Sequence, residues 1–171
     1  MNEFNDAMFK TKVDNIFIKL YTSIMKMDLS DVDHFIGDSL YNELQSRIDN
    51  LKSSNKRQMY DELNVKNTSI ISRNIIDDKE VVEVEVISRY MDYIIDIDSG
   101  DIISGDDTRR VEKRNILVFE KKINTKNIDI VRRCPGCGAS ISVNTSGKCE
   151  YCDTIFNQED YDYVLVSIDV N

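Results

Sequence analysis

Apolar residues in the first part of the chain recur at intervals of three or four positions, which is the spacing of one helix face. We therefore expect a first helix over residues 4 to 27. Its apolar stripe is formed by Phe9, Val13, Ile16, Phe17, Leu20 and Ile24. A stripe of this kind is far more often the buried face of a core helix than a cofactor site, so we assign it to the core.

Helix start signals follow at two places. Ser30, with Asp33 three residues later, predicts a short helix. Asp38, directly after Gly37, predicts a longer one, because its carboxylate can accept hydrogen bonds from unpaired backbone N–H groups. The longer helix should end in the polar run 53–57. Its buried face is expected to consist of Leu40, Leu44, Ile48 and Leu51.

From about residue 63 the hydrophobic period changes to two. Three valines at positions 82, 84 and 86 alternate with glutamates, which predicts a strand over residues 81–95, continuing through Tyr90 and Tyr93, with one buried and one exposed face. Residues 109–123 and 161–170 predict two more strands of the same antiparallel sheet. The aspartate-rich run 96–107 predicts a hairpin tip, because its glycines and acids do not follow the order of a calcium-binding loop.

The order of these elements, helices first and strands later, predicts an α+β fold in which the helices pack on an antiparallel sheet. A chain of 171 residues with 41% hydrophobic content is large enough to bury a substantial core. We therefore expect one domain over residues 1–171.

All four cysteines of the chain lie in two CxxC pairs within the run CPGCGASISVNTSGKCEYC. A CxxC turn brings two thiolates to one side of a loop, and two such turns supply the tetrahedral sulfur site that zinc prefers. The expected ligands of one Zn²⁺ ion are Cys134, Cys137, Cys149 and Cys152. Because four thiolates fill the coordination of zinc, the predicted site is structural and not catalytic. Disulfides, a redox pair and unrelated buried thiols are the alternatives.

The cysteine segment lies between two of the expected strands. We therefore predict a zinc-ribbon insert over residues 132–156, with the last strand, 161–170, returning to the parent sheet.

Net charge and apolar run lengths limit the functions that the chain can have. Its net charge of −9 argues against nucleic-acid binding through the whole surface. Charged residues interrupt every apolar run well before the roughly 18 residues that a membrane-spanning helix needs, and the opening residues MNEFND are acidic where a signal peptide would be basic. We therefore expect no transmembrane segment and a cytoplasmic protein with reduced thiols.

Positive charge is concentrated in one part of this acidic chain. Residues 109–133 contain nine Lys or Arg and three Asp or Glu, a balance of +6, so the remainder totals −15. One interpretation is a basic face near the ribbon that docks an acidic protein segment or anionic lipid headgroups. The other is a strand edge that lysine and arginine protect from aggregation. The residues concerned are Arg109, Arg110, Lys113, Arg114, Lys121, Lys122, Arg132 and Arg133.

Several segments together resemble the Tim-44-like domain family, in particular its bacterial members with an inserted zinc ribbon. The resemblance rests on the helical opening FIKLYTSIMKMDLSDVDHFIGDSLYNELQSRIDNL, the strand and hairpin VVEVEVISRYMDYIIDIDSGDIISGD, the motifs CPGCGA and SGKCEYC, and the closing DYVLVSID. It implies a nuclear-transport-factor-2-like fold, a cone of helices on a curved antiparallel sheet with an apolar pocket. It also implies a transport- or import-associated binding role. The membrane attachment of bacterial relatives is not transferred to this chain, and a peripheral position at the inner face of the membrane is an expectation beside the cytoplasmic one.

Two classes of function follow. The first is a non-enzymatic domain that binds a protein, a peptide or anionic lipid. The second is an isomerase- or dehydratase-like enzyme that uses the cone pocket, since the same fold hosts such chemistry. We favour the first, because no acid–base pair is recognisable. Asp92, beside Tyr90 and Tyr93, is the least poor candidate for a catalytic carboxylate, and we favour the alternative that it is a solvent-facing strand residue. The single histidine, His34, has no ligand motif beside it, so we expect it at the surface or at the boundary of the core.

Overall fold

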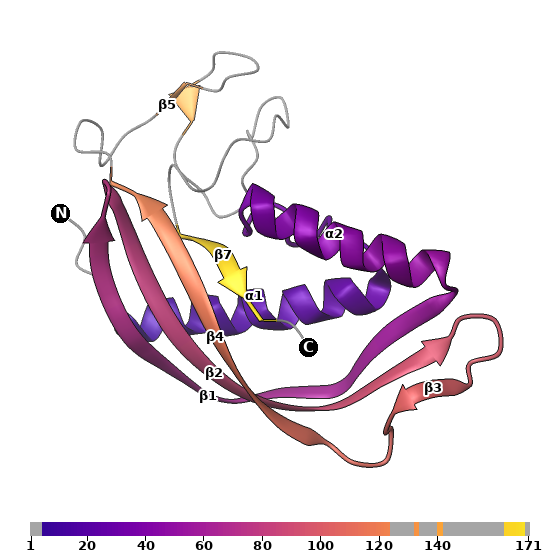
Figure 1. Cartoon of the computed structure of the whole chain (residues 1–171). Helices are drawn as coiled ribbons and strands as arrows, with labels where there is room; N and C mark the ends of the chain where they lie inside the picture. The colour runs from indigo at the N-terminus through magenta and orange to yellow at the C-terminus, as the bar shows by residue number, and fades with distance from the viewer. Residues whose placement is uncertain (1–4, 124–131, 134–139, 142–162, 170–171) are drawn as a thin grey trace.

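The computed structural model describes residues 5–123, 132–133, 140–141 and 163–169, and in this part of the chain two helices lie on the concave side of a curved, unclosed antiparallel sheet (Figure 1). The helices come first in the chain and the strands follow. The prediction of an α+β fold with helices packed on an antiparallel sheet is therefore confirmed.

Helix α1 spans Asp6–Lys26 and matches the helix predicted over residues 4 to 27. It begins where the side chain of Asn5 accepts a hydrogen bond from the backbone N–H of Met8, at 3.0 Å. It ends at Met27, which adopts a left-handed conformation with φ of 60°. The whole predicted stripe is buried, and Tyr21, which the stripe omitted, is buried with it.

Helix α2 spans Asp38–Ser53 and buries Leu40, Leu44 and Ile48, as predicted, whereas Leu51 is only half-buried. The predicted short helix from Ser30 is wrong, because residues 30–35 form turns. The chain there is held by a contact that is remote in sequence.

This remote contact is a short parallel bridge to the last strand. The backbone N–H of Gly37 donates to the carbonyl of Leu165 at 2.8 Å, and the N–H of Leu165 donates to the carbonyl of Phe35 at 2.9 Å. The residues between the two helices are therefore fixed by the far end of the chain.

Four strands form the main path of the sheet, in the order β1–β2–β4–β7, and all neighbours are antiparallel. Their bounds are Lys56–Ile76 for β1, Lys79–Asp96 for β2, Val111–Lys122 for β4 and Val164–Ile168 for β7. The three predicted strands thus belong to one sheet. The expected onset of strand structure near residue 63 is wrong by seven positions, since β1 begins at Lys56.

The expected hairpin tip is present, because β3 (Ile102–Gly105) folds back on β2. Gly105 has a φ of +86°, and a Cβ atom at this position would lie 2.2 Å from the carbonyl oxygen of Asp92. Only glycine fits so close to the neighbouring strand.

Two further short strands, β5 (Arg132–Arg133) and β6 (Ser140–Ile141), pair with each other in a separate two-stranded sheet. They lie on either side of residues 134–139 in the chain. The domain boundaries predicted for the ribbon fall largely outside the described residues.

Candidate functional site

The concave face of the sheet is where a cone-shaped fold would hold a ligand. Alternate residues of β2 face the helices there, and every one of them from residue 82 to residue 90 is fully buried. They are Val82, Val84, Val86, Ser88 and Tyr90. Leu117 and Phe119 of β4 extend this apolar surface, and the ring of Phe9 packs edge-on against Phe119 with centroids 5.5 Å apart.

Three buried tyrosines occupy the interior beside α1. Tyr21 from α1, Tyr60 from β1 and Tyr90 from β2 are each 0% exposed. Their ring centroids lie 4.5 Å (Tyr21 to Tyr60), 5.2 Å (Tyr60 to Tyr90) and 5.7 Å (Tyr21 to Tyr90) apart. Three helix or strand elements therefore meet in one aromatic cluster, which fills this part of the space between helices and sheet.

The tyrosine cluster is tied to α2 through Arg47, whose Nη2 donates to the Tyr60 hydroxyl at 3.1 Å. Burial raises the pKa of both Tyr21 and Tyr60 well above the ordinary tyrosine value. The hydroxyls of Tyr21 and Tyr60 therefore remain protonated at physiological pH.

The sequence could have revealed two members of this cluster. Tyr21 lies four residues after Phe17, which is the spacing of the apolar stripe, and Tyr90 continues the alternation of the valines in β2. Tyr60 could not be assigned, because it precedes the position at which alternation becomes visible.

Asp92, the candidate catalytic carboxylate, is half-buried on the concave face beyond Tyr90. Its Oδ1 accepts a hydrogen bond from Nε2 of Gln58 on β1 at 2.7 Å. Tyr93, which was predicted to continue the same strand, lies on the opposite face, where its hydroxyl donates to Asp61. Asp92 and Tyr93 therefore do not face a common site.

His34 lies in the turn segment before α2. Its Nε2 is 3.2 Å from Oδ1 of the neighbouring Asp33, and its side chain is 11% exposed. This position at the boundary of the core is the one expected from sequence.

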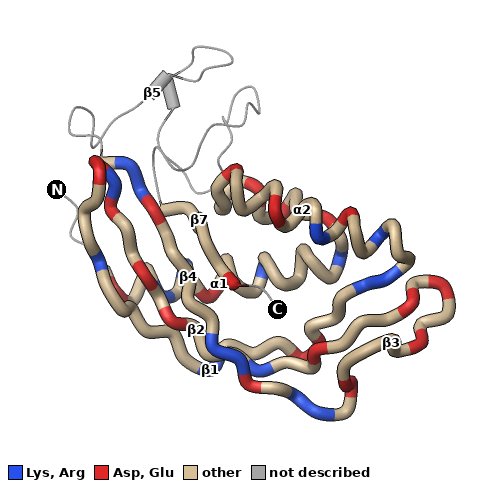
Figure 2. The backbone as a smooth tube through the Cα atoms, viewed as in Figure 1, with Lys and Arg blue, Asp and Glu red and all other residues tan. Residues whose placement is uncertain are grey.

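The basic residues of β4 are divided between the two faces of the sheet. Lys113 and Lys121 share the side of Leu117, whereas Arg114 and Lys122 point to the other side. Arg109 and Arg110 precede the strand, and Lys113 and Arg114 lie near its start. Lys121 and Lys122 end it, so the basic residues are grouped at the two ends of β4 (Figure 2).

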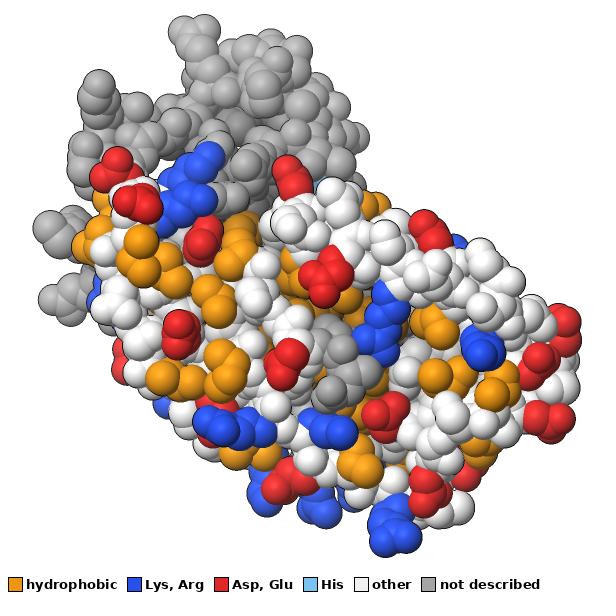
Figure 3. Space-filling model, in the orientation of Figure 1, with side chains coloured by type: hydrophobic (Ala, Val, Ile, Leu, Met, Phe, Trp, Pro, Cys, Tyr) orange, Lys and Arg blue, Asp and Glu red, His pale blue; other side chains and the backbone are white. Residues whose placement is uncertain are grey.

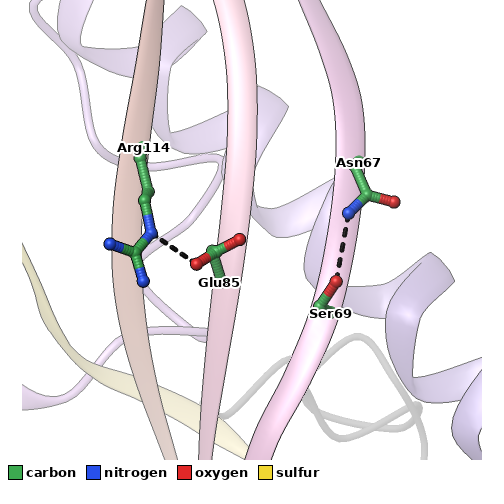
Figure 4. Close-up of polar contacts among 4 residues, drawn as sticks. All are labelled: Asn67, Ser69, Glu85 and Arg114. Atoms are coloured by element: carbon green, nitrogen blue, oxygen red, sulfur yellow. Dashed lines mark hydrogen bonds and ion pairs between the residues drawn. The ribbon is translucent and has the colours of Figure 1, made fainter.

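Several of these basic side chains interact with acidic or aromatic groups of the same chain. Arg114 forms an ion pair with Glu85 on the convex face, near the hydrogen bond from Asn67 to Ser69 (Figure 4). Arg110 Nε lies 3.7 Å from Glu62 Oε2. Lys121 Nζ lies 5.5 Å from the centroid of the Tyr163 ring. Lys121 and Lys122 thus lie on opposite faces near the end of β4 and are separated along the strand from Arg109 and Arg110.

A shallow surface groove of about 470 Å³ runs between the C-terminal half of α2 and the adjoining ends of β1 and β2. Leu51 and Ile94 provide apolar lining, and Arg47 and Lys56 provide cations. Hydrophobic side chains are exposed in this region between α2 and the β2–β3 hairpin (Figure 3). Sequence analysis did not identify this groove, because its walls come from segments about 40 residues apart.

Comparison with known families shows to which family the chain belongs. The family model of the Tim44-like domain matches residues 2–129. This chain belongs to the Tim44-like domain family. No curated protein matches the chain.

The matched range of the Tim44-like domain contains α1, α2 and strands β1 to β4. It ends before the two cysteine pairs. The predicted zinc ligands, Cys134, Cys137, Cys149 and Cys152, all lie outside the described residues. Arg132 and Arg133 form β5, and only their backbone is described.

Neither helix in the described part of this Tim44-like chain combines the length and the apolarity that a bilayer crossing needs.

Proposed function

We propose that this Tim44-like chain is a non-enzymatic binding domain for a protein or peptide partner. The observation that carries the proposal is the aromatic packing of the concave interior. The buried rings of Tyr21, Tyr60 and Tyr90 fill part of the space between helices and sheet, where a cone-shaped enzyme would hold its substrate. The hydroxyls of Tyr21 and Tyr60 also stay protonated, because burial raises the pKa of both. Because side chains fill its interior, such a domain would bind a partner through its outer surface.

The membership of the family supports an import- or transport-associated role for this binding. On this proposal the protein acts in the cytoplasm and associates peripherally with the inner face of the membrane. The partner is a protein segment that the domain recognises, and anionic lipid headgroups make a second, electrostatic contact.

A structural zinc ribbon is the second part of the proposal. The four thiolates of the CxxC pairs would hold one Zn²⁺ ion and leave no coordination position for a substrate. The antiparallel pairing of β5 with β6 supports this arrangement, because the two strands flank the first cysteine pair in the sequence. Arg132 and Arg133 on β5 would then present their charge beside the metal site.

The test is affinity purification of the tagged full chain from its native host after cross-linking. We expect a specific protein to be enriched over a tag-only control. Its recovery should fall in an Arg132→Glu, Arg133→Glu variant. A matched variant, Lys10→Glu with Lys52→Glu, makes the same change in charge on α1 and α2 and should retain the partner.

Two results would contradict the proposal. The first is enrichment of nothing beyond the tag-only control. The second is a turnover of a small molecule that Asp92→Asn abolishes while the melting temperature is unchanged, because such a result would place chemistry in the interior.

A further inference from the structure

Two polar side chains on the concave face are buried with one oxygen atom each unused. Ser88 and Asn115 are both 0% exposed. Within the described residues, neither Ser88 Oγ nor Asn115 Oδ1 has a hydrogen-bond partner. Buried polar atoms in proteins nearly always bind either another protein group or an ordered water molecule.

The strand register places the two side chains close together. Val86 pairs with Asn115 and Ser88 pairs with Lys113, so Ser88 and Asn115 are diagonal neighbours on one face of β2 and β4. Diagonal neighbours in a sheet are about 7–8 Å apart at Cα and closer at their side chains. One small molecule can therefore contact both oxygens.

The amide of Asn115 has a fixed orientation. Its Nδ2 donates to the backbone carbonyl and to Oδ1 of Asp169, directly after β7, the second at 3.2 Å. Because the amide group is planar, its Oδ1 points away from Asp169 and remains available as an acceptor. Asn115 thus holds the end of β7 through Nδ2, while its Oδ1 is directed to the interior.

The chemistry of these atoms defines the molecule that fits. Asn115 Oδ1 can only accept a hydrogen bond, so the molecule must be a donor, whereas the Ser88 hydroxyl can donate or accept. Val86, Tyr90 and Leu117, which flank the pair on this face, are fully buried, which favours a small neutral species. Lys113, directly opposite Ser88, lies on the same face and is only partly buried.

We propose that a buried water molecule bridges Ser88 Oγ and Asn115 Oδ1 and links β2 to β4 beneath the helices. This hydration site is independent of the proposed partner binding. It makes Asn115 a junction between three strands, since the same side chain holds the end of β7.

Thermal unfolding of Ser88→Ala, Asn115→Ala and the double variant tests the bridge. Ser88→Ala should lower the melting temperature by about 2–4 °C, the shift that loss of one hydrogen bond produces in a chain of this size. The double variant should lose less than the sum of the single variants, because either substitution removes the same bridge. Ser23→Ala, at a buried serine of α1, serves as the matched control and should be additive with Asn115→Ala.

A second measurement does not depend on the stability of the variants. In the wild-type protein, nuclear magnetic resonance should show cross-peaks from water to the side-chain amide protons of Asn115, and Ser88→Ala should abolish them. Absence of these cross-peaks in the wild type would overturn the inference. An unchanged or higher melting temperature of Ser88→Ala would also overturn it, because removal of an unpaired hydroxyl is neutral or stabilising.

Discussion

Several polar residues in the described part of this domain pair with partners that are distant in sequence. Arg47 of α2 binds Tyr60 of β1, and Gln58 binds Asp92 across two strands. Such pairs depend on strand register, which local sequence does not specify. For this reason the sequence predicted which residues are buried more accurately than which polar groups meet.

Tyr93 offers a test of one such pair through pH. Its hydroxyl donates to the carboxylate of Asp61, and this hydrogen bond, followed by burial, raises the pKa of Tyr93 to about 12. Because the pKa is raised in the folded state, the stabilisation is fully present below pH 10 and is lost as the pH rises toward 12. Tyr93→Phe should therefore show a shallower loss of stability between pH 10 and pH 12 in urea denaturation.

The comparison isolates Tyr93, because the buried Tyr21 and Tyr60 are present in both proteins. Asp61→Asn provides the control, since a neutral acceptor should bring the pKa of Tyr93 closer to its ordinary value. The assignment of the pair would be wrong if wild type and Tyr93→Phe lost stability in parallel over this range.

Whole elements were predictable where one face is buried without interruption. Helix α1 and strand β2 have this property, and their stripes identified them correctly. Strand β1 does not, because its register against β2 shifts three times, between Asp61 and Asn64, between Val65 and Asn67, and between Ile70 and Ser72. Each irregularity disturbs the alternation of faces, so a single period cannot be seen in the sequence.

The segment before α2 failed as a prediction for a different reason. The local turn here is formed by Asp28 and not by the side chain of Ser30, since the carboxylate of Asp28 accepts a hydrogen bond from the backbone N–H of Ser30. The conformation that follows is set by the bridge from Phe35 and Gly37 to Leu165. A contact over about 130 residues cannot be inferred from propensity.

Deletion of residues 162–171 tests the role of β7 as part of the main sheet. The strand buries Val164, Leu165 and Ile168, pairs with β4 and holds the segment before α2. Its loss would expose apolar surface of β4 and release the turns between the helices. We expect the truncated chain to lose its cooperative thermal unfolding transition.

A shorter deletion of residues 170–171 is the matched control and should leave the transition intact. If the longer truncation also kept a cooperative transition at an unchanged temperature, β7 would be an appendage and would not be part of the folded unit.

At the scale of the whole molecule, the zinc site can be predicted from local sequence, whereas the aromatic cluster of the interior cannot. The zinc ligands are suggested by spacing alone, because each CxxC turn is local. The interior cluster combines Tyr21, Tyr60 and Tyr90 from three elements, and only the folded structure brings these together. Metal binding nevertheless remains a prediction, since the cysteines lie outside the described residues.

Elemental analysis of protein purified under reducing conditions should find one zinc per chain. Serine at any one of the four cysteines should reduce the zinc content and loosen the ribbon, while the sheet formed by β1, β2, β4 and β7 keeps its cooperative unfolding. Ser146→Ala, between the two pairs, is the control and should retain zinc. Less than half an equivalent of metal, or a stable disulfide between the pairs, would disprove the structural zinc site.

The charge distribution leads to the final prediction. The chain has a net charge of −9, yet residues 109–133 carry +6. Within this range, Arg110 and Arg114 are already engaged with Glu62 and Glu85. The test is directed at Arg132 and Arg133, which directly precede the first predicted zinc ligand in the sequence. Each cation near an anionic membrane surface contributes on the order of 1 kcal/mol.

Co-sedimentation with vesicles that contain phosphatidylserine measures this attraction. At low salt we expect more of the wild type than of Arg132→Glu, Arg133→Glu in the pellet, with Lys10→Glu, Lys52→Glu as the variant of equal charge. Binding should weaken as salt is raised, because the Debye length falls to about 8 Å at physiological ionic strength. Equal sedimentation of wild type and the Arg132, Arg133 variant, or no sedimentation even at low salt, would remove lipid as a partner and leave an acidic protein segment as the target of this charge.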